Sequence, residues 1–458
     1  MLLNKGTTHR GSPALQKIVR YTILTICAIV FVSVSVLLLF PDTGINGFLK
    51  NRVTQGMEKN HPEYALRIAE VHYNVWENCI QCDSITFKNA NTAFTCRIYS
   101  ASIKKINWIK IFLHGDITPR IISNSILDAK GIVLDLPKSH NKLRCEMLHL
   151  SGPDSSMVTD SVTWYSLIGD EQFFGKSNYR QTRLNFTIPQ IRITGLYWMA
   201  LIQGNGFIAR RITLCDFFAD ILVNMDKPSR RSSSKPLMPN EALHAMNGIV
   251  NIDSIKIING RLNYAERYAL HAQPGVITFS KIMLSITKIA NHTNYPDTIA
   301  LNGKGLFMDS GIMTLAMALP LSSKDFSLRY SGSLGTMNLA ALNKFLEPAE
   351  HRRIKSGIVH HAAYSINVLS GHASGILHAE YQDLSIAVLD KKTGSENGIF
   401  NRLSSLIGKL FVIHGSNLPD KGRTMNVGII KYSRNQDNNF TQFLWFGLRS
   451  GVGDIVGF

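Results

Sequence analysis

The chain has 458 residues, of which 45% are hydrophobic and 18% charged, and this content excludes a largely disordered chain. Six cysteines are too few for a disulfide scaffold, and a mean hydropathy near zero excludes a polytopic transporter. The 49 Lys and Arg against 32 Asp and Glu give a formal charge of +17, which suits an anionic partner without choosing between nucleic acid and phospholipid.

An uncharged run from Tyr21 to Phe40 predicts a transmembrane helix, because 1.5 Å of rise per residue lets it span a hydrocarbon core of about 30 Å. Residues 1–20 contain Lys and Arg but no acid, so the positive-inside rule places this basic tip in the cytoplasm and residues 41–458 outside. The alternative is a cleaved signal peptide, whose apolar run is about 7–15 residues long. The longer run here, which ends in bulky residues, favours an uncleaved, single-pass anchor.

Residues 41–226 are expected to form an N-terminal β block. A short helix is expected at its beginning, within residues 47–59. Strand periodicity is clear near its end, where apolar residues alternate with polar ones at Leu184, Phe186 and Ile188, and at Ile191 and Ile193. Residues 227–240 combine Pro, Ser and basic residues, which predicts a flexible basic loop.

Residues 241–391 are expected to form a C-terminal β block. Three of its segments alternate between apolar and polar residues, so that each predicted strand has one apolar face. The apolar positions are Ile282, Leu284 and Ile286, then Phe326, Leu328 and Tyr330, then Leu384, Ile386 and Val388. We expect these nine side chains to share one surface.

Two turns and one bend are predicted in this block. Asn259-Gly260 between apolar runs predicts a two-residue hairpin turn at 257–264, because this turn type needs positive φ. Asp309 to Gly311 predicts a second turn, followed by a strand at 312–319 that is apolar on both faces and therefore expected to be covered on both. The apolar phase slips once within 249–258, from Val250 and Ile252 to Ile255 and Ile257, which predicts a bulge or bend.

Helices are expected mainly near the C-terminus. Asn338 stands at a plausible N-cap before a helix at 338–346. Within 392–458, apolar residues at three- and four-residue spacing predict amphipathic helices at 398–413 and 438–450, with a strand, MNVGIIKY, between them.

No catalytic motif is recognisable, and we expect no enzyme activity, no cofactor and no metal. His351, His360, His361, His372 and His378 cluster in the sequence, but no carboxylate follows at ligand spacing. Cys79 and Cys82 form a C-x-x-C without a second pair, which leaves open a bridge from either to Cys96 or Cys145. Basic residues are scattered along strands, so a nucleic-acid partner is not expected.

Three runs of the C-terminal block resemble AsmA-like proteins, the group that includes AsmA, TamB and YhdP. The runs are VNIDSIKIINGRLNYAER, then LNGKGLFMDSGIMTLAMALPLSSKDFSLRYSGSLGTMNLAALNKFLEP, then GHASGILHAEYQDLSIAVLDKK. The resemblance lies in the order and spacing of strand and turn motifs, whereas residues 41–240 are similar to the family only in architecture. The resemblance implies an anchored periplasmic protein with a long, bent, apolar β groove and no catalytic residues.

The expected fold is therefore mainly β: one transmembrane helix, then an elongated, twisted, groove-forming and antiparallel-rich sheet, with a few C-terminal amphipathic helices. Strands about 4.8 Å apart, at roughly 13 residues for each strand and turn, predict a sheet about 120–130 Å long. The expected location is the bacterial inner membrane, with the body in the periplasm.

The function implied is phospholipid transport between the two membranes, or outer-membrane assembly, with the nine apolar residues as groove candidates. The expected partners are a phospholipid or another acyl-chain lipid, the inner membrane, and outer-membrane or envelope proteins. The alternative is a non-enzymatic scaffold of the cell envelope whose β core is closed.

Overall fold

The computed structural model describes residues 63–74, 76–89, 94–106, 123–229, 236–291, 298–321, 325–390, 414–419, 424–435 and 437–457, with ten residues between 28 and 55. Most of the expected anchor at 21–40 and the whole expected helix at 398–413 lie outside these residues. Among the residues described, no helix is both long and apolar enough to cross a bilayer.

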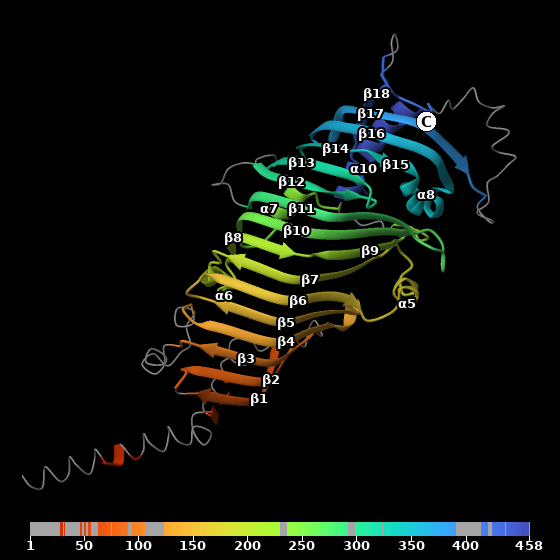
Figure 1. Ribbon diagram of the computed structural model, residues 1–458. Coiled ribbons are helices and arrows are strands. Elements are labelled where there is room, and N and C mark those ends of the chain that lie inside the picture. Colours follow the sequence, from red (N-terminus) through yellow and green to blue (C-terminus); the bar gives the residue numbers. More distant parts are fainter. Residues whose placement is uncertain are drawn as a thin grey trace, which may run out of the picture.

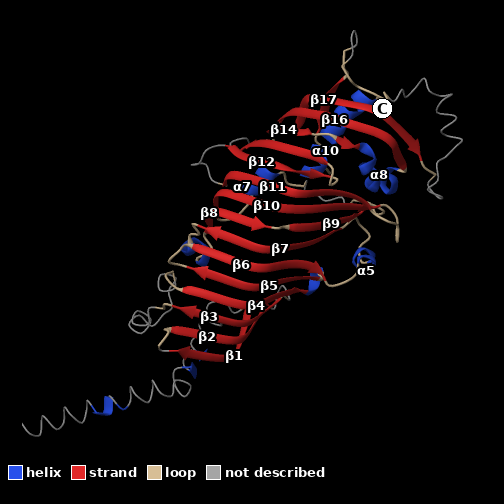
Figure 2. Cartoon of the chain, in the orientation of Figure 1, coloured by secondary structure: helices blue, strands red, loops and turns tan. Residues whose placement is uncertain are grey.

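The described chain forms one large sheet of 18 strands, so the expectation of a mainly β protein with a mostly antiparallel sheet is confirmed (Figures 1 and 2). The strands of its first half are β1 (Tyr64–Asn74), β2 (Cys79–Asn89), β3 (Thr95–Lys104), β4 (Ile126–Leu136), β5 (Asn141–Ser151), β6 (Ser156–Ser166), β7 (Thr182–Thr194), β8 (Gly206–Cys215) and β9 (Phe218–Asn224). The second half contains β10 (Ile249–Arg267), β11 (Gly275–Ala290), β12 (Thr298–Phe307), β13 (Gly311–Pro320), β14 (Leu328–Leu334), β15 (Met337–Asn338), β16 (Arg352–Leu369), β17 (His372–Val388) and β18 (Val427–Ser433).

The helices described from residue 63 onward are short, apart from the last. They are α5 (Asp170–Gly175), α6 (Trp198–Ile202), α7 (Pro239–His244), α8 (Asn343–Glu350) and α10 (Phe440–Val456), with 3-10 turns at Pro137–Ser139 and Leu339–Leu342. The predicted N-cap is confirmed, because Asn338 Oδ1 accepts a hydrogen bond from Ala340 N at 2.9 Å. The helix predicted at 438–450 is confirmed as α10, and the strand before it as β18.

Strands pair with their neighbours in the sequence, except at two positions that are each filled by two strands. β8 and β9 lie end to end at one position between β7 and β10, antiparallel to β7 and parallel to β10. The parallel pairing joins the two expected β blocks into one sheet. Because β8 and β9 share a position, as do β14 and β15, the 18 strands fill sixteen positions, or roughly 75 Å at about 4.8 Å each. The expected 120–130 Å was too long because strands reach 19 residues.

The hairpin predicted at 257–264 is wrong, because β10 continues through it from Ile249 to Arg267. Asn259 does adopt the positive φ that its turn chemistry suggested, at 56°. It bends the strand instead of reversing it, and its Nδ2 donates to Asp216 Oδ1 at 2.6 Å, at the break between β8 and β9. The hairpin predicted at Asp309 to Gly311 is confirmed between β12 and β13.

The predicted phase slip is also confirmed. The pairing of β10 with β11 joins Ile252 to Ile289 and Ser254 to Thr287, and passes over Asp253 and Lys288 between them. Lys288 has a φ of 61°, and the pairing keeps the same register on both sides of it, so the slip is a bend and not a bulge.

The C-terminal half of the sheet has one face sealed by helices. α10 packs on β18 and β17, and its Phe443, which is fully buried, contacts the rings of Phe326 and Tyr432. The helix lies very close to the sheet: a Cβ on Gly428 would stand only 2.2 Å from Gly451 O. The expectation that strand 312–319 is covered on both faces is wrong, since Met317 and Leu319 are buried while Ile312 is 49% exposed.

Both edges of the sheet are capped. At β18, Ile429 N donates to Asp454 Oδ2 and Lys431 N donates to Ser450 Oγ, both side chains of α10. At β1, Tyr73 N donates to Asn46 Oδ1 at 2.9 Å. These contacts satisfy three backbone donors at the two edges, which leaves fewer donors free to pair with another strand.

Candidate functional site

One face of strands β1 to β7 is built from four rows of side chains that run across the strands and are apolar except for Thr159. We call this set the apolar face. The rows are Leu66, Phe87, Cys96, Leu134, Leu143, Trp164 and Phe186; Ile68, Ile85, Ile98, Ile132, Cys145, Val162 and Ile188; Val71, Cys82, Ala101, Ala129, Leu148, Thr159 and Ile191; and Tyr73, Ile80, Ile103, Leu127, Leu150, Met157 and Ile193.

Charge is segregated between the two faces of these strands. None of the residues in the four rows is ionisable as an acid or a base at neutral pH, although the strands hold many such residues. Those residues lie on the opposite, polar face, where Arg97 Nη2 and Lys142 Nζ pair with Asp135 and Arg144 pairs with Glu146. Strand alternation produces this separation, since neighbouring side chains point to opposite faces.

A bend runs across all seven strands between the second and third rows. In each strand the two rows are three residues apart instead of two, as in Cys145 and Leu148. Two residues in place of one therefore lie between the rows and face away from the apolar face. Ser84, Gly131 and Ser161, in alternate strands, take one of these two places with φ near 50–60°. Gly131 is suited to it because a Cβ there would lie 2.9 Å from Tyr99 Cβ, its cross-strand neighbour.

The bend is directed towards the apolar face. Beside it, Cys145, Val162 and Ile188 are 6–8% exposed and pack on one another and on the flanking rows. On the other side of the same bend, Tyr99 is 75% exposed, and Glu146 and Pro189 are exposed too. The side chains on the inner side of the bend are therefore drawn together.

The outer rows of the apolar face stay partly exposed. All seven residues of the first row are only half-buried, and within the described residues no helix packs over the first two rows. Trp164 and Phe186 stack there with centroids 6.3 Å apart. Leu196 and Trp198 cover part of the opposite margin, near Met157 and Ile193. The first row of the apolar face is thus partly accessible on β1 to β7, whereas the continuation of this face on β10 to β17 is sealed.

The residues predicted to line a groove lie in the sealed half. Phe326, Leu328 and Tyr330 are 3%, 1% and 4% exposed beneath α10, and burial raises the pKa of Tyr330. They form the core and do not line an open surface. The sequence could not reveal this, because alternation specifies an apolar face without specifying what covers it.

The other six predicted residues are not gathered on an open surface either. Ile282, Leu284 and Ile286 are half-buried on β11, and Ile286 packs against the core beneath α7 and α10. Leu384 packs against that core as well, Ile386 is half-buried and Val388 is 43% exposed. The accessible rows on β1 to β6 were missed, although their alternation and three-residue slip are legible in the sequence.

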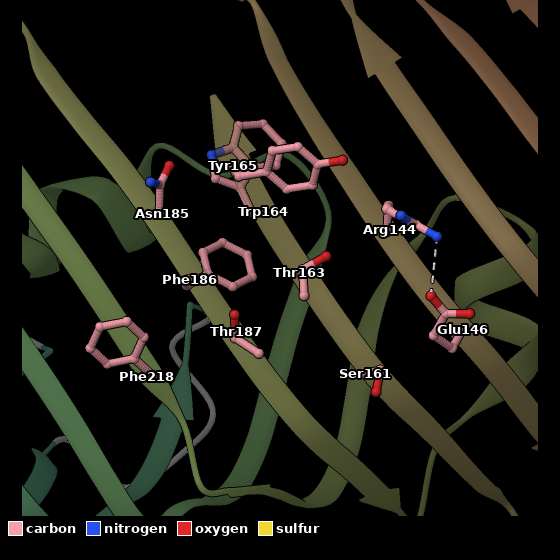
Figure 3. Close-up of a pocket in the computed structure, with 10 residues that line it drawn as sticks. All are labelled: Arg144, Glu146, Ser161, Thr163, Trp164, Tyr165, Asn185, Phe186, Thr187 and Phe218. Carbon is pink, nitrogen blue, oxygen red and sulfur yellow. Dashed lines mark hydrogen bonds and ion pairs between the residues drawn. The ribbon is translucent and has the colours of Figure 1, made fainter. Parts of the chain in front are cut away.

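A shallow depression of about 580 Å³ lies on β5 to β7 and β9 (Figure 3). Arg144, Thr163, Thr187 and Phe218 are successive cross-strand partners on the polar face within it. Figure 3 also shows the ion pair between Arg144 and Glu146, whose atoms are 3.4 Å apart. The depression is open, and aromatic side chains line it together with the polar ones, among them Trp164 and Phe186 of the first row of the apolar face.

Titratable clusters are few in the part of the chain described. Glu70, His72 and Asp83 place ligand-type atoms within 4.8 Å of one another on the exposed polar face. Two of the five clustered histidines have a polar neighbour: His360 contacts Gln382, and His372 contacts Ser433.

Five described cysteines are free thiols, and none forms the bridge that the sequence left open. Cys82, Cys96 and Cys145 belong to the apolar face, and burial raises the pKa of each. The pKa of Cys82 rises to about 11, through burial first and the charge of Asp83 second. The thiols are thus protonated and unreactive near neutral pH.

We predict slow alkylation of Cys82 in the folded protein. A pKa of about 11 leaves roughly one thiolate in a thousand at pH 8, against about one in ten for an ordinary thiol of pKa 9.0, so iodoacetamide should react about 100-fold more slowly than in urea. The rate should rise about tenfold per pH unit up to pH 11. Peptide mass spectrometry after timed quenching measures this, and equal rates in buffer and urea would contradict it.

Comparison with protein-family models and with curated proteins gives no match to this chain.

Proposed function

We propose that this protein holds the acyl chains of a lipid in a groove formed by the apolar face of β1 to β7. One observation carries the proposal: a face without charged side chains stays partly exposed on β1 to β7, although helices seal its continuation. An accessible apolar surface of this extent normally marks a binding site. The bend would wrap the two flanks of the sheet around a bound chain.

The dimensions and energetics agree with this proposal. Seven strands at about 4.8 Å extend the groove over roughly 29 Å. An acyl chain occupies half of a hydrocarbon core, or about 15 Å, so the groove can accept a phospholipid tail along its length. Each CH₂ removed from water contributes about 0.8 kcal/mol, which holds a chain without a headgroup pocket.

The biological setting follows from the sequence resemblance. An anchored AsmA-like protein would use this groove in phospholipid transport between inner and outer membranes, or in outer-membrane assembly, from a periplasmic position. The sealed half of the sheet would serve as a rigid support for the open half. That sealed core also favours a second candidate function, a scaffold of the cell envelope that binds protein partners and no lipid.

Photocrosslinking in cells tests the proposal with adjacent aromatic residues. A photoreactive phenylalanine analogue at Trp164 faces the groove, whereas one at Tyr165 faces the polar side. We expect a phospholipid adduct at position 164 and none at 165. Tyr330, sealed beneath α10, is a second negative control. Equal labelling at 164 and 165 would contradict the proposal, and protein adducts without lipid would favour the scaffold.

A further inference from the structure

A patch of unpaired basic side chains lies on the polar face of β7 to β14. These strands are in the middle of the sheet in Figure 1. We call it the basic patch, and it consists of Arg192, Arg211, Lys256, Lys288, Lys304 and Arg329. All six are exposed, and no ion pair or hydrogen bond joins their side chains to another described residue.

Strand register places these residues on one face. Arg192 is opposite Thr213, which is opposite Lys256, which is opposite Ser285. The remaining residues follow on the same face of the adjoining strands. From β7 to β14 the patch extends over roughly 29 Å.

The patch differs in its surroundings from the other basic residues of the same face. On β3 to β5, Arg97, Lys142 and Arg144 are each neutralised by a carboxylate. Around the patch, Asp216 accepts a hydrogen bond from Asn259, Asp309 pairs with Arg261, and Asp253 is exposed. The patch is therefore a locally positive surface that attracts a polyanion.

Exposed aliphatic side chains stand among the charges. Ile258, Met283 and Ile312 are 44%, 62% and 49% exposed on this polar face, and Met283 is directly opposite Lys304. Basic and aliphatic side chains together suit the headgroup region of an anionic bilayer, where the charges meet phosphates and the aliphatic groups enter the interface. Nucleic-acid surfaces instead set aromatic side chains among the basic ones, for base stacking.

We propose that the basic patch docks on the surface of an anionic phospholipid bilayer. This surface is opposite to the apolar face, so the inference does not depend on the proposed lipid groove. Attraction through exposed charges falls off within about 8–10 Å and weakens in salt. The docking is thus reversible and sensitive to both lipid charge and ionic strength.

The test uses two triple variants of equal charge change. Arg211→Gln, Lys256→Gln and Lys304→Gln remove three charges of the patch, whereas Arg97→Gln, Lys142→Gln and Arg144→Gln remove three paired charges on the same face. The full chain, held in nanodiscs of neutral phosphatidylcholine, is assayed by flotation for capture of labelled vesicles containing about one-third phosphatidylglycerol.

We expect the patch variant to capture about 10- to 100-fold fewer vesicles than the wild type, and the paired-charge variant to differ by less than about threefold. Capture should be absent with phosphatidylcholine vesicles and should fall at high salt. Equal losses in both variants, or equal capture of neutral vesicles, would overturn the proposal. Binding of a single-stranded oligonucleotide in place of the vesicles would also overturn it and assign the patch to nucleic acid.

Discussion

Phe443→Ala is expected to destabilise the C-terminal half of the sheet by about 3–5 kcal/mol, the usual cost of deleting a fully buried phenylalanine. The ring lies 5.1 Å from that of Phe326 and 5.6 Å from that of Tyr432, so its loss leaves a cavity between α10 and the strands. Because α10 also caps β18, the edge strand should loosen with it. Urea denaturation followed by circular dichroism measures the change.

Trp445→Ala is the matched control, since Trp445 is in the same helix and 48% exposed. Its effect should stay within about 0.5 kcal/mol, as for most surface substitutions. Similar shifts in both variants would mean that α10 does not seal the apolar face through Phe443.

Leu134→Glu is expected to reduce bound lipid at least tenfold, and this prediction depends on the proposed groove. Leu134 lies in the first row of the apolar face, between Cys96 and Leu143, without a basic neighbour in that row. A carboxylate there must stay hydrated, and covering it with an acyl chain costs several kcal/mol. Lipid content per protein is measured by native mass spectrometry of the full chain.

Val133→Glu provides the control for this substitution, with the same charge change one residue away. Val133 faces the polar side, between Arg97 and Arg144, where a carboxylate is solvated and near positive charge. Its bound lipid should match that of the wild type. If both variants keep their lipid, the apolar face is not the binding surface; if the wild type carries none, the groove proposal fails.

The bend of β10 at Asn259 shows how much a local sequence pattern can predict. Asn259-Gly260 has the residues of a tight turn, and Asn259 has the positive φ that such a turn needs. The chain nevertheless continues as β10, because the neighbouring strands bend at the same level, at Asp216 and Lys281, which also have positive φ. Turn residues thus specify a local dihedral angle, while the surrounding strands decide whether the chain reverses or only bends.

The position of an open apolar surface depended on which part of the sheet the helices cover. The strands at Ile282 to Ile286 and Leu384 to Val388 were predicted correctly, and the one predicted from Phe326 begins at Leu328. The prediction that these strands form an open surface was wrong. Helices α7 and α10, which come from distant parts of the chain, pack over the C-terminal half of the sheet. Arg434, after β18, joins α7 through Glu241 at 2.8 Å, a contact between residues 193 positions apart.

The sequence by itself determined the β class, the two-faced strands, the β12–β13 hairpin, the slip at Asp253 and the last helix, because each depends on side-chain period or turn chemistry within a few residues. Only the tertiary structure decided that β8 and β9 share one position, that Asn259 bends its strand, and which half of the apolar face is sealed. These features depend on contacts between distant segments, and packing free energy there outweighs local preference.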